Sequence, residues 1–173
     1  MRITTLLLAL LVVAGAAASE ANEMLKPGDP FPAWKLTDHT GATVSSQDLA
    51  GTTYLLWYYP KALSPGCARE GCELRDNYEA FQAKGVAVLG VSFDDLRDNA
   101  RFVSEHNFPF RLLSDTERDL AVRVGAADSP KRVWARRISY LVGSDGKVLK
   151  AYSDVNPTAH AGQVLADLEA LGR

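Results

Sequence analysis

The sequence predicts one α/β domain with a mixed central β-sheet flanked by helices. Apolar runs typical of buried strands alternate with helical repeats through the middle of the chain, and a hairpin signal lies toward each end. The 173 residues suit one domain with a sizeable core, and the sequence contains no internal repeat and no second domain.

Seven strands are expected from alternating or continuous apolar runs, at residues 33–38, 43–45, 53–59, 86–93, 110–113, 138–142 and 148–152. The first two form an N-terminal hairpin around His39-Thr40-Gly41, and the last two form a hairpin around Ser144-Asp145-Gly146. The runs at 53–59 and 86–93 carry no charge, which is typical of fully buried strands.

Helical spacing predicts a capped turn and four helices, at residues 46–51, 64–85, 96–107, 115–124 and 159–171. In the first long helix Leu74, Tyr78 and Phe81 recur on one face, and Gly85 is a typical stop. The remaining inward positions are expected to be Ala100, Phe102 and Val103 in the next helix and Val164, Leu168 and Leu171 in the closing helix.

The N-terminus resembles an export signal. Arg2 supplies a positive start, residues 6–13 an apolar core, and Ala16-Ala17-Ala18 a small-residue cleavage site. We expect a cleaved signal peptide at 1–18, a flexible lead at 19–24 and the folded domain at 25–173, and an uncleaved anchor is the alternative. The mature protein is then periplasmic or secreted, with no stable membrane association.

Charge and composition argue against several functions. The formal net charge is −2 with no basic run, so no nucleic-acid partner is expected. No Cys/His spacing resembles a zinc site, and no glycine-rich phosphate loop is present, so neither a metal nor a cofactor is expected. The three histidines, His39, His106 and His160, are interpreted as surface or loop residues, and the cluster at 57–59 as core and pocket wall.

Both cysteines lie just after the strand at 53–59. Ser64 is a good N-cap and Pro65 suits the first helical position, which makes Cys67 the third helical residue. A thiolate there would sit among unpaired N–H groups at the positive end of the helix dipole, and such an environment lowers a thiol pKa. Cys67 is therefore a candidate nucleophile.

Spacing alone leaves a second interpretation of the cysteines open, namely a structural disulfide between Cys67 and Cys72. The Ser-Pro-Gly framing of Cys67 favours chemistry. Two cysteines are also too few to form the disulfide scaffold of an exported domain of this size, which favours a redox role as well. Cys72 could alternatively be a small buried apolar residue.

The sequence resembles the peroxiredoxin family. The pattern Pro60-x-x-x-Ser64-x-x-Cys67 is similar to its signature Pro-x-x-x-Thr/Ser-x-x-Cys, with Ser64 where many members have threonine. A second cysteine after four intervening residues is similar to the Q-type, or bacterioferritin-comigratory, members. Further matching motifs, in the family's order, lie at 26–32, 36–41, 72–76, 112–115 and 137–142.

The resemblance implies a thioredoxin-like fold and a thiol peroxidase of the atypical 2-Cys type. Cys67 would attack hydrogen peroxide or an alkyl hydroperoxide, and Cys72 would resolve the sulfenic acid as an intramolecular disulfide. By motif, Arg137 would be the catalytic arginine and Pro60 would shield the thiol, with the Ser64 hydroxyl as a local donor. Strand alternation would point the adjacent Arg136 to the opposite face.

Two competing functions stay open beside the peroxidase. An exported thiol–disulfide oxidoreductase would normally show Cys-x-x-Cys, whereas this spacing is Cys-x-x-x-x-Cys. A non-enzymatic domain with a structural disulfide is the other. For the peroxidase we expect a monomer and a thioredoxin-like reductant.

Overall fold

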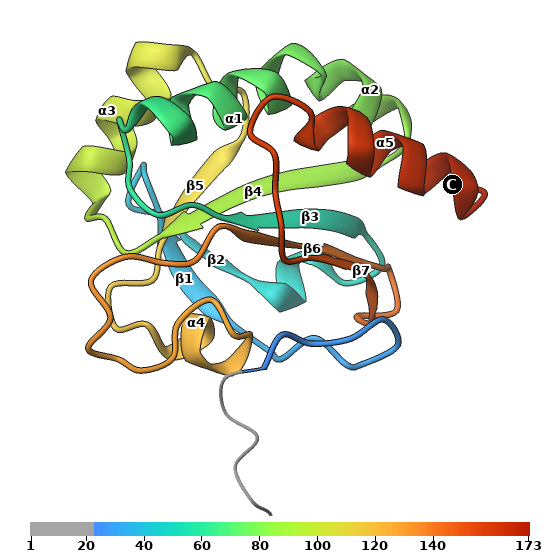
Figure 1. Cartoon of the computed structure of the whole chain (residues 1–173), viewed down its shortest axis with the longest axis horizontal. Helices are drawn as coiled ribbons and strands as arrows, with labels where there is room; N and C mark the ends of the chain where they lie inside the picture. The colour runs from blue at the N-terminus through green and yellow to red at the C-terminus, as the bar shows by residue number, and fades with distance from the viewer. Residues whose placement is uncertain (1–22) are drawn as a thin grey trace, which may run out of the picture.

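Seven strands form one mixed sheet in the order β2-β1-β5-β4-β3-β6-β7. The computed structural model describes residues 23–173 (Figure 1). The expected signal peptide at 1–18 lies outside these residues, as does all but the end of the lead at 19–24. Among the described residues, no helix has the length and apolar character needed to cross a membrane.

The strands keep close to their expected positions, with bounds of β1 Lys35–Asp38, β2 Thr43–Ser45, β3 Thr53–Tyr58, β4 Val86–Ser92, β5 Arg111–Ser114, β6 Ile138–Val142 and β7 Val148–Tyr152. The centre of the sheet is parallel, because β4 pairs in parallel with both β3 and β5. Antiparallel pairing of β1 with β2 and β5, and of β6 with β3 and β7, completes the mixed sheet and its N-terminal hairpin.

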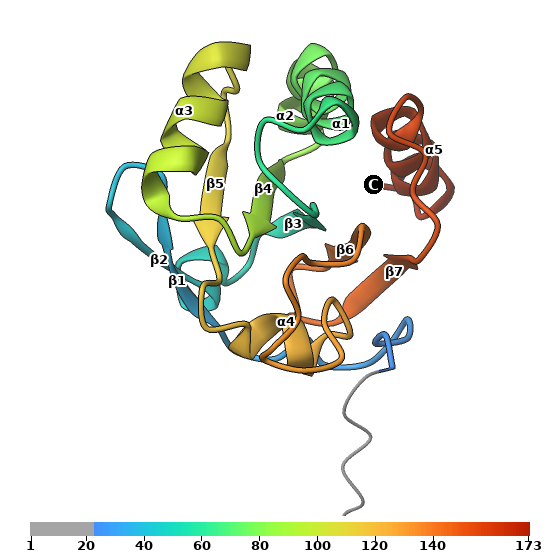
Figure 2. The ribbon, with the colours of Figure 1, turned by 60° about the vertical axis from the view of Figure 1, so that its left-hand side comes forward.

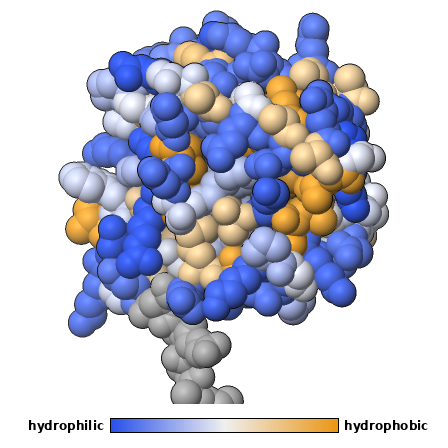
Figure 3. Space-filling view, turned by 45° about the vertical axis from the view of Figure 1, so that its right-hand side comes forward, coloured by the Kyte–Doolittle hydropathy of each residue, from blue (hydrophilic) through white to orange (hydrophobic). Residues whose placement is uncertain are grey.

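The helices cover the two faces of the sheet unequally. Their bounds are η1 Ser46–Leu49, α1 Pro65–Asp76, α2 Tyr78–Ala83, α3 Leu96–His106, α4 Asp119–Arg123 and α5 His160–Ala170. Figures 1 and 2 show α1, α2, α3 and α5 over one face and the short α4 on the other. The face of the molecule in Figure 3 is mostly hydrophilic, with separate hydrophobic patches.

Strand β3 divides its side chains between two cores, since successive residues point to opposite faces. Tyr54, Leu56 and Tyr58 belong to the cluster on the α4 side. Leu55, Trp57 and the following Tyr59 belong to the cluster under the other helices, which also contains Cys67. This confirms the expected core role of the aromatic run at 57–59 and places Cys67 against it.

The long helix expected over 64–85 is wrong, because the structure divides it at Asn77 into α1 and α2. The Asn77 side chain donates to the Glu73 carbonyl at 2.9 Å, so it competes with the backbone for a helical acceptor. The closing helix also differs from expectation, since it ends at Ala170 and leaves Leu171 41% exposed rather than on the inner face.

The helix expected over 115–124 is shorter than its sequence suggested, because Arg118 takes a left-handed conformation at φ 60° immediately before α4. The Asp115 carboxylate, which we expected inside the helix, instead accepts from the Ala121 N–H at 2.8 Å and from the Tyr58 hydroxyl at 2.9 Å. Asp115 is thereby buried beneath α4.

Candidate active site

Cys67 is held by a short loop between β3 and α1. Two adjacent residues of the loop are constrained. The Ala62 N–H donates to the Asp94 carboxylate at 2.7 Å, and Leu63 takes the left-handed conformation at φ 63°. A non-glycine residue in that region is strained, and such strain gathers at functional sites. The loop ends at Ser64, which is the N-cap residue of α1, as the sequence predicted.

Cys67 is the third residue of α1 and has 0% of its surface exposed. The first N–H groups of a helix have no intrahelical acceptor and carry partial positive charge. Cys67 therefore lies among the free N–H groups at the start of the helix, and its sulfur is shielded from bulk water. Pro60 and Ser64 are half-buried beside this position in the chain.

The Ser64 side chain does not cap the helix, although its sequence position predicts a cap. Its hydroxyl donates to the Lys61 carbonyl at 2.9 Å and makes no hydrogen bond to the backbone of α1. The N–H groups at the start of α1 therefore keep their positive potential for another acceptor.

Arg137 reaches Cys67 from the start of β6. Its Nη2 lies 3.4 Å from the Cys67 sulfur, across 70 positions of sequence. Gly66 leaves the space for this approach, because a β-carbon there would lie 3.3 Å from Nη2. Arg136 points elsewhere, donating to the Gly125 carbonyl at 3.1 Å, as strand alternation predicted.

A buried carboxylate anchors the guanidinium. The Nη1 of Arg137 pairs with Oε2 of Glu70, whose side chain is fully buried. The other oxygen, Oε1, lies 2.9 Å from Nδ1 of His160, at the start of α5. His160 on α5 thus contacts Glu70 on α1, Glu70 contacts Arg137 at the start of β6, and Arg137 contacts the Cys67 sulfur.

The electrostatics of this chain keep Arg137 charged. Burial by itself lowers the pKa of Arg137, but the charges of Glu70 and Cys67 outweigh that effect, so the pKa is raised above its ordinary value. Arg137 is therefore a cation beside the sulfur at neutral pH.

Glu70 and His160 were missed as site residues by the sequence reasoning. Glu70 could have been found, because it lies three residues after Cys67 and so on the same helical face. His160 carries no such signal. Its interpretation as a surface or loop residue is wrong: it is fully buried, and its Nε2 has no hydrogen-bond partner among residues 23–173.

Cys72 lies apart from the Cys67 network. It is half-buried, both cysteines are free thiols, and α1 is continuous through them. Its sulfur instead lies 3.6 Å from Nδ1 of His106, in the last turn of α3. His106 is half-buried in a helix, so it lies partly at the surface as expected and contacts Cys72 as well.

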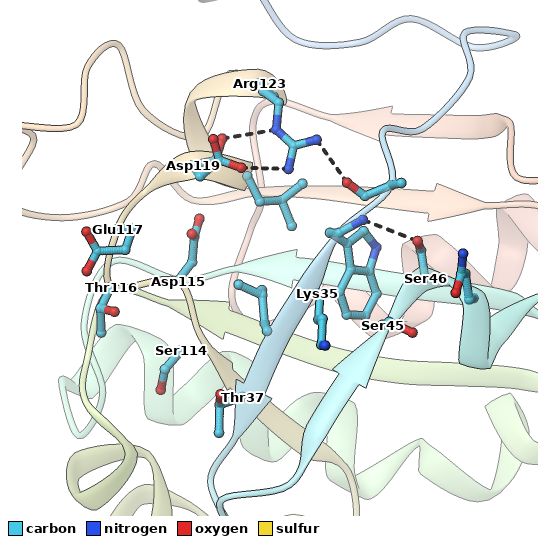
Figure 4. Close-up of a pocket in the computed structure, with 15 residues that line it drawn as sticks. Lys35, Thr37, Ser45, Ser46, Ser114, Asp115, Thr116, Glu117, Asp119 and Arg123 are labelled. Carbon is cyan, nitrogen blue, oxygen red and sulfur yellow. Dashed lines mark hydrogen bonds and ion pairs between the residues drawn. The ribbon is translucent and has the colours of Figure 1, made fainter.

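A large pocket lies apart from the Cys67 network. Its volume is about 710 Å³, and Figure 4 shows that it is lined by β1, the start of α4 and the segment at 114–117. None of the five residues expected from the sequence to form the site is in its lining. Trp134, in the loop before Arg137, has 56% of its surface in solvent and is not in the lining either.

Together the mixed sheet and the buried cysteine at a helix N-terminus define a thiol-based redox protein. The AhpC/TSA family model matches residues 27–151, and the chain belongs to this family. Its relatives are peroxiredoxins of the Bcp, or Q-type, group. The chain is 34% identical over 153 residues to peroxiredoxin Bcp of Escherichia coli, covering 82% of this chain and 94% of that protein.

Solved structures support the same assignment and a thioredoxin-like fold. Peroxidoxin BcpB of Mycobacterium tuberculosis superimposes with a TM-score of 0.79 at 31% identity, covering 86% of this chain and 99% of that one. The bacterioferritin comigratory protein of Xanthomonas campestris, described for its alkyl peroxide reduction activity, gives 0.73 at 27% identity, with 81% and 92% covered. These relatives support a peroxidase among the oxidoreductases rather than either competing function.

Replacing Glu70 with glutamine is expected to destabilise the protein and slow its chemistry. The substitution removes the negative partner of a largely buried guanidinium, and breaking a buried ion pair costs about 3 kcal/mol. Denaturant unfolding of the reduced protein measures the loss. Glu73→Gln is the matched control on the same helix, because glutamine can still accept from the Ala161 N–H that Glu73 now binds. Equal stability of the two variants would contradict an anchoring role for Glu70.

Proposed function

We propose that the protein reduces hydrogen peroxide and organic hydroperoxides through a Cys67 sulfenic acid that Cys72 resolves as an intramolecular disulfide. The observation that carries this proposal is the Cys67 sulfur, buried at the N-terminus of α1 and 3.4 Å from the Arg137 guanidinium. Family membership supports the peroxidase class, and the residue roles are our proposal.

In the first step the Cys67 thiolate attacks one oxygen of the peroxide. The O–O bond breaks, the attacked oxygen stays on sulfur as the sulfenic acid, and the other oxygen leaves as an alkoxide or hydroxide that takes up a proton. Donors aimed at the separating oxygens stabilise this charge. In our proposal Arg137, which lies 3.4 Å from the sulfur, serves in this way with the N–H groups of Gly66 and Cys67, and the Ser64 hydroxyl joins them by leaving the Lys61 carbonyl.

Resolution requires α1 to change. Residues five apart on a continuous helix have α-carbons about 8.6 Å apart and point about 140° away from each other. A disulfide needs roughly 4.4–6.8 Å. Since α1 is continuous over Pro65–Asp76, the Cys67 end must unwind before the two sulfurs can meet. We therefore propose an atypical 2-Cys peroxidase whose attack and resolution occur in different conformations.

The remaining parts of the proposal rest on the sequence. The N-terminal segment resembles an export signal, which favours a periplasmic or secreted protein, and we expect this protein to be a monomer. Outside the cytoplasm the disulfide would be reduced by an exported dithiol protein of the thioredoxin-like class. Export can be tested by locating the full-length protein in cell fractions and sequencing its mature N-terminus, where cleavage after Ala18 is expected.

One experiment separates this function from the two alternatives. Pre-reduced protein is mixed with one equivalent of hydrogen peroxide, and free thiols are counted over time. We expect rapid loss of both thiols. Inertness toward peroxide together with reduction of insulin would instead indicate a thiol–disulfide oxidoreductase. Inertness in both assays with a large loss of stability in mild reductant would indicate a structural disulfide.

A further inference from the structure

His106 places an imidazole nitrogen against the second cysteine. Its Nδ1 lies 3.6 Å from the Cys72 sulfur, and the contact joins the last turn of α3 to the middle of α1. Figures 1 and 2 show these two helices on the same face of the sheet. His106 makes no contact with Cys67, Arg137 or Glu70 in the described hydrogen-bond network, so it belongs to the resolving half of the site.

The imidazole is held in place by aromatic rings. It stacks on Phe108 with ring centroids 5.5 Å apart and meets the edge of Phe102 at 5.3 Å. His106 is half-buried, so the ring is oriented by packing but can still exchange protons with solvent. A fixed imidazole beside a thiol is the arrangement by which proteins activate a cysteine.

The half of α1 that carries Cys72 is locked onto α3. A β-carbon at Gly71 would lie 2.4 Å from the Phe108 ring, so the two helices are in direct contact there. Arg75 donates to the His106 carbonyl at 2.6 Å, and Leu74 is fully buried. Cys72 therefore stays beside His106 while the Cys67 end of the helix unwinds toward it.

From this geometry we infer that His106 is the general base that activates Cys72 for resolution, an inference that rests on the proposed peroxidase function. His106 takes the proton of the Cys72 thiol as that sulfur attacks the Cys67 sulfenic sulfur. The new S–S bond forms and the S–O bond breaks. The departing hydroxide receives a proton from the imidazolium through solvent and leaves as water. Cys72 is oxidised, the Cys67 sulfur is reduced, and no further reactant is needed.

Other charges near the imidazole are few. Arg75 and Cys72 face it from α1, and Glu105 on α3 pairs with Arg101 at 2.6 Å. The pKa of Arg75 is raised, mainly by its hydrogen bond to Asp76. Burial opposes this increase, and the Cys72 sulfur adds to it. A Cys72 thiolate thus has the Arg75 cation on one side and the imidazole that received its proton on the other.

The test measures the two steps separately in the full protein. The rate of sulfenic acid formation is followed by peroxide consumption, and the rate of resolution by loss of a dimedone-reactive sulfenic acid. His106→Phe keeps an aromatic ring between Phe102 and Phe108 but has no proton acceptor. His106→Asn keeps a hydrogen-bonding group that is not a base. His39→Asn, in the β1–β2 hairpin, is the control.

Both His106 variants should resolve on the order of 100-fold more slowly, a typical loss for a general base. Peroxide consumption in the first turnover should stay within about twofold of wild type, and the control should match wild type in both steps. In His106→Phe the acid limb of the pH–rate profile for resolution should move to higher pH, where the thiol ionises unaided.

Resolution at the wild-type rate in His106→Phe would overturn the inference and leave the peroxidase proposal standing. Normal resolution in His106→Asn alone would also overturn it, because a hydrogen bond rather than a base would then suffice. If wild type itself consumes no peroxide, the proposed function fails first, and the inference fails with it.

Discussion

Cys67→Ser is expected to abolish peroxide consumption, the largest effect of any substitution in the chain. A serine hydroxyl stays protonated at neutral pH and cannot replace the thiolate that attacks the O–O bond. Because Cys67 is fully buried among apolar neighbours, the near-isosteric change should leave the fold intact. Stopped-flow peroxide assays with the reduced variant measure the loss, and circular dichroism checks the fold.

Cys72→Ser is the matched variant. It should still consume one equivalent of peroxide and then stop with a sulfenic acid on Cys67, visible as a mass increase or by dimedone labelling. If Cys72→Ser is inert and Cys67→Ser still reacts, the two cysteines have exchanged roles, and the assignment of Cys67 to the helix N-terminus would not explain the chemistry.

Arg137→Met is expected to slow the first step about 100-fold, which corresponds to about 3 kcal/mol for one preorganised donor. Methionine fills part of the same volume but removes the cation 3.4 Å from the sulfur. The variant also leaves Glu70 buried without its guanidinium, so the unfolding free energy should fall as well. Pre-steady-state rates of thiol oxidation at several peroxide concentrations measure the catalytic effect.

Arg136→Met serves as the control for this substitution. The neighbouring arginine binds the Gly125 carbonyl and lies 3.6 Å from Asp128, so its loss should change the peroxide rate by less than about twofold. Small and equal effects of the two substitutions would remove Arg137 from the site.

The central part of the fold was predictable because its signals are local. An uncharged run forms β3 and alternates its side chains between two cores, and Ser64-Pro65 begins α1 where capping preferences place a helix start. The approach of Arg137 to Cys67 was inferred from a family motif instead, because no local pattern joins residues that lie 70 positions apart.

The residues that sequence reasoning missed act through tertiary contacts. His160 and His106 look ordinary in the sequence, yet the packing of α5 and α3 against α1 brings one to Glu70 and the other to Cys72. The break at Asn77 was missed for a different reason: the flanking residues keep helical spacing, whereas the Asn77 backbone departs from it at φ −104° and ψ 8°, with its side chain sharing the Glu73 carbonyl with its own N–H.

Amide hydrogen exchange in the reduced and disulfide forms tests the account most directly, because its central claim is that Cys67 leaves α1 to meet Cys72. Residues 68–74 should exchange faster in the disulfide form, since each of these N–H groups loses its bond to a carbonyl four residues earlier, beginning with Ala68 to Ser64. Gly66 lowers the cost of unwinding the Cys67 end, because a glycine weakens a helix by about 1 kcal/mol relative to alanine. Protection in α3 should persist. Identical exchange over residues 68–74 in the two forms, with the Cys67–Cys72 disulfide verified by peptide mass, would contradict the account.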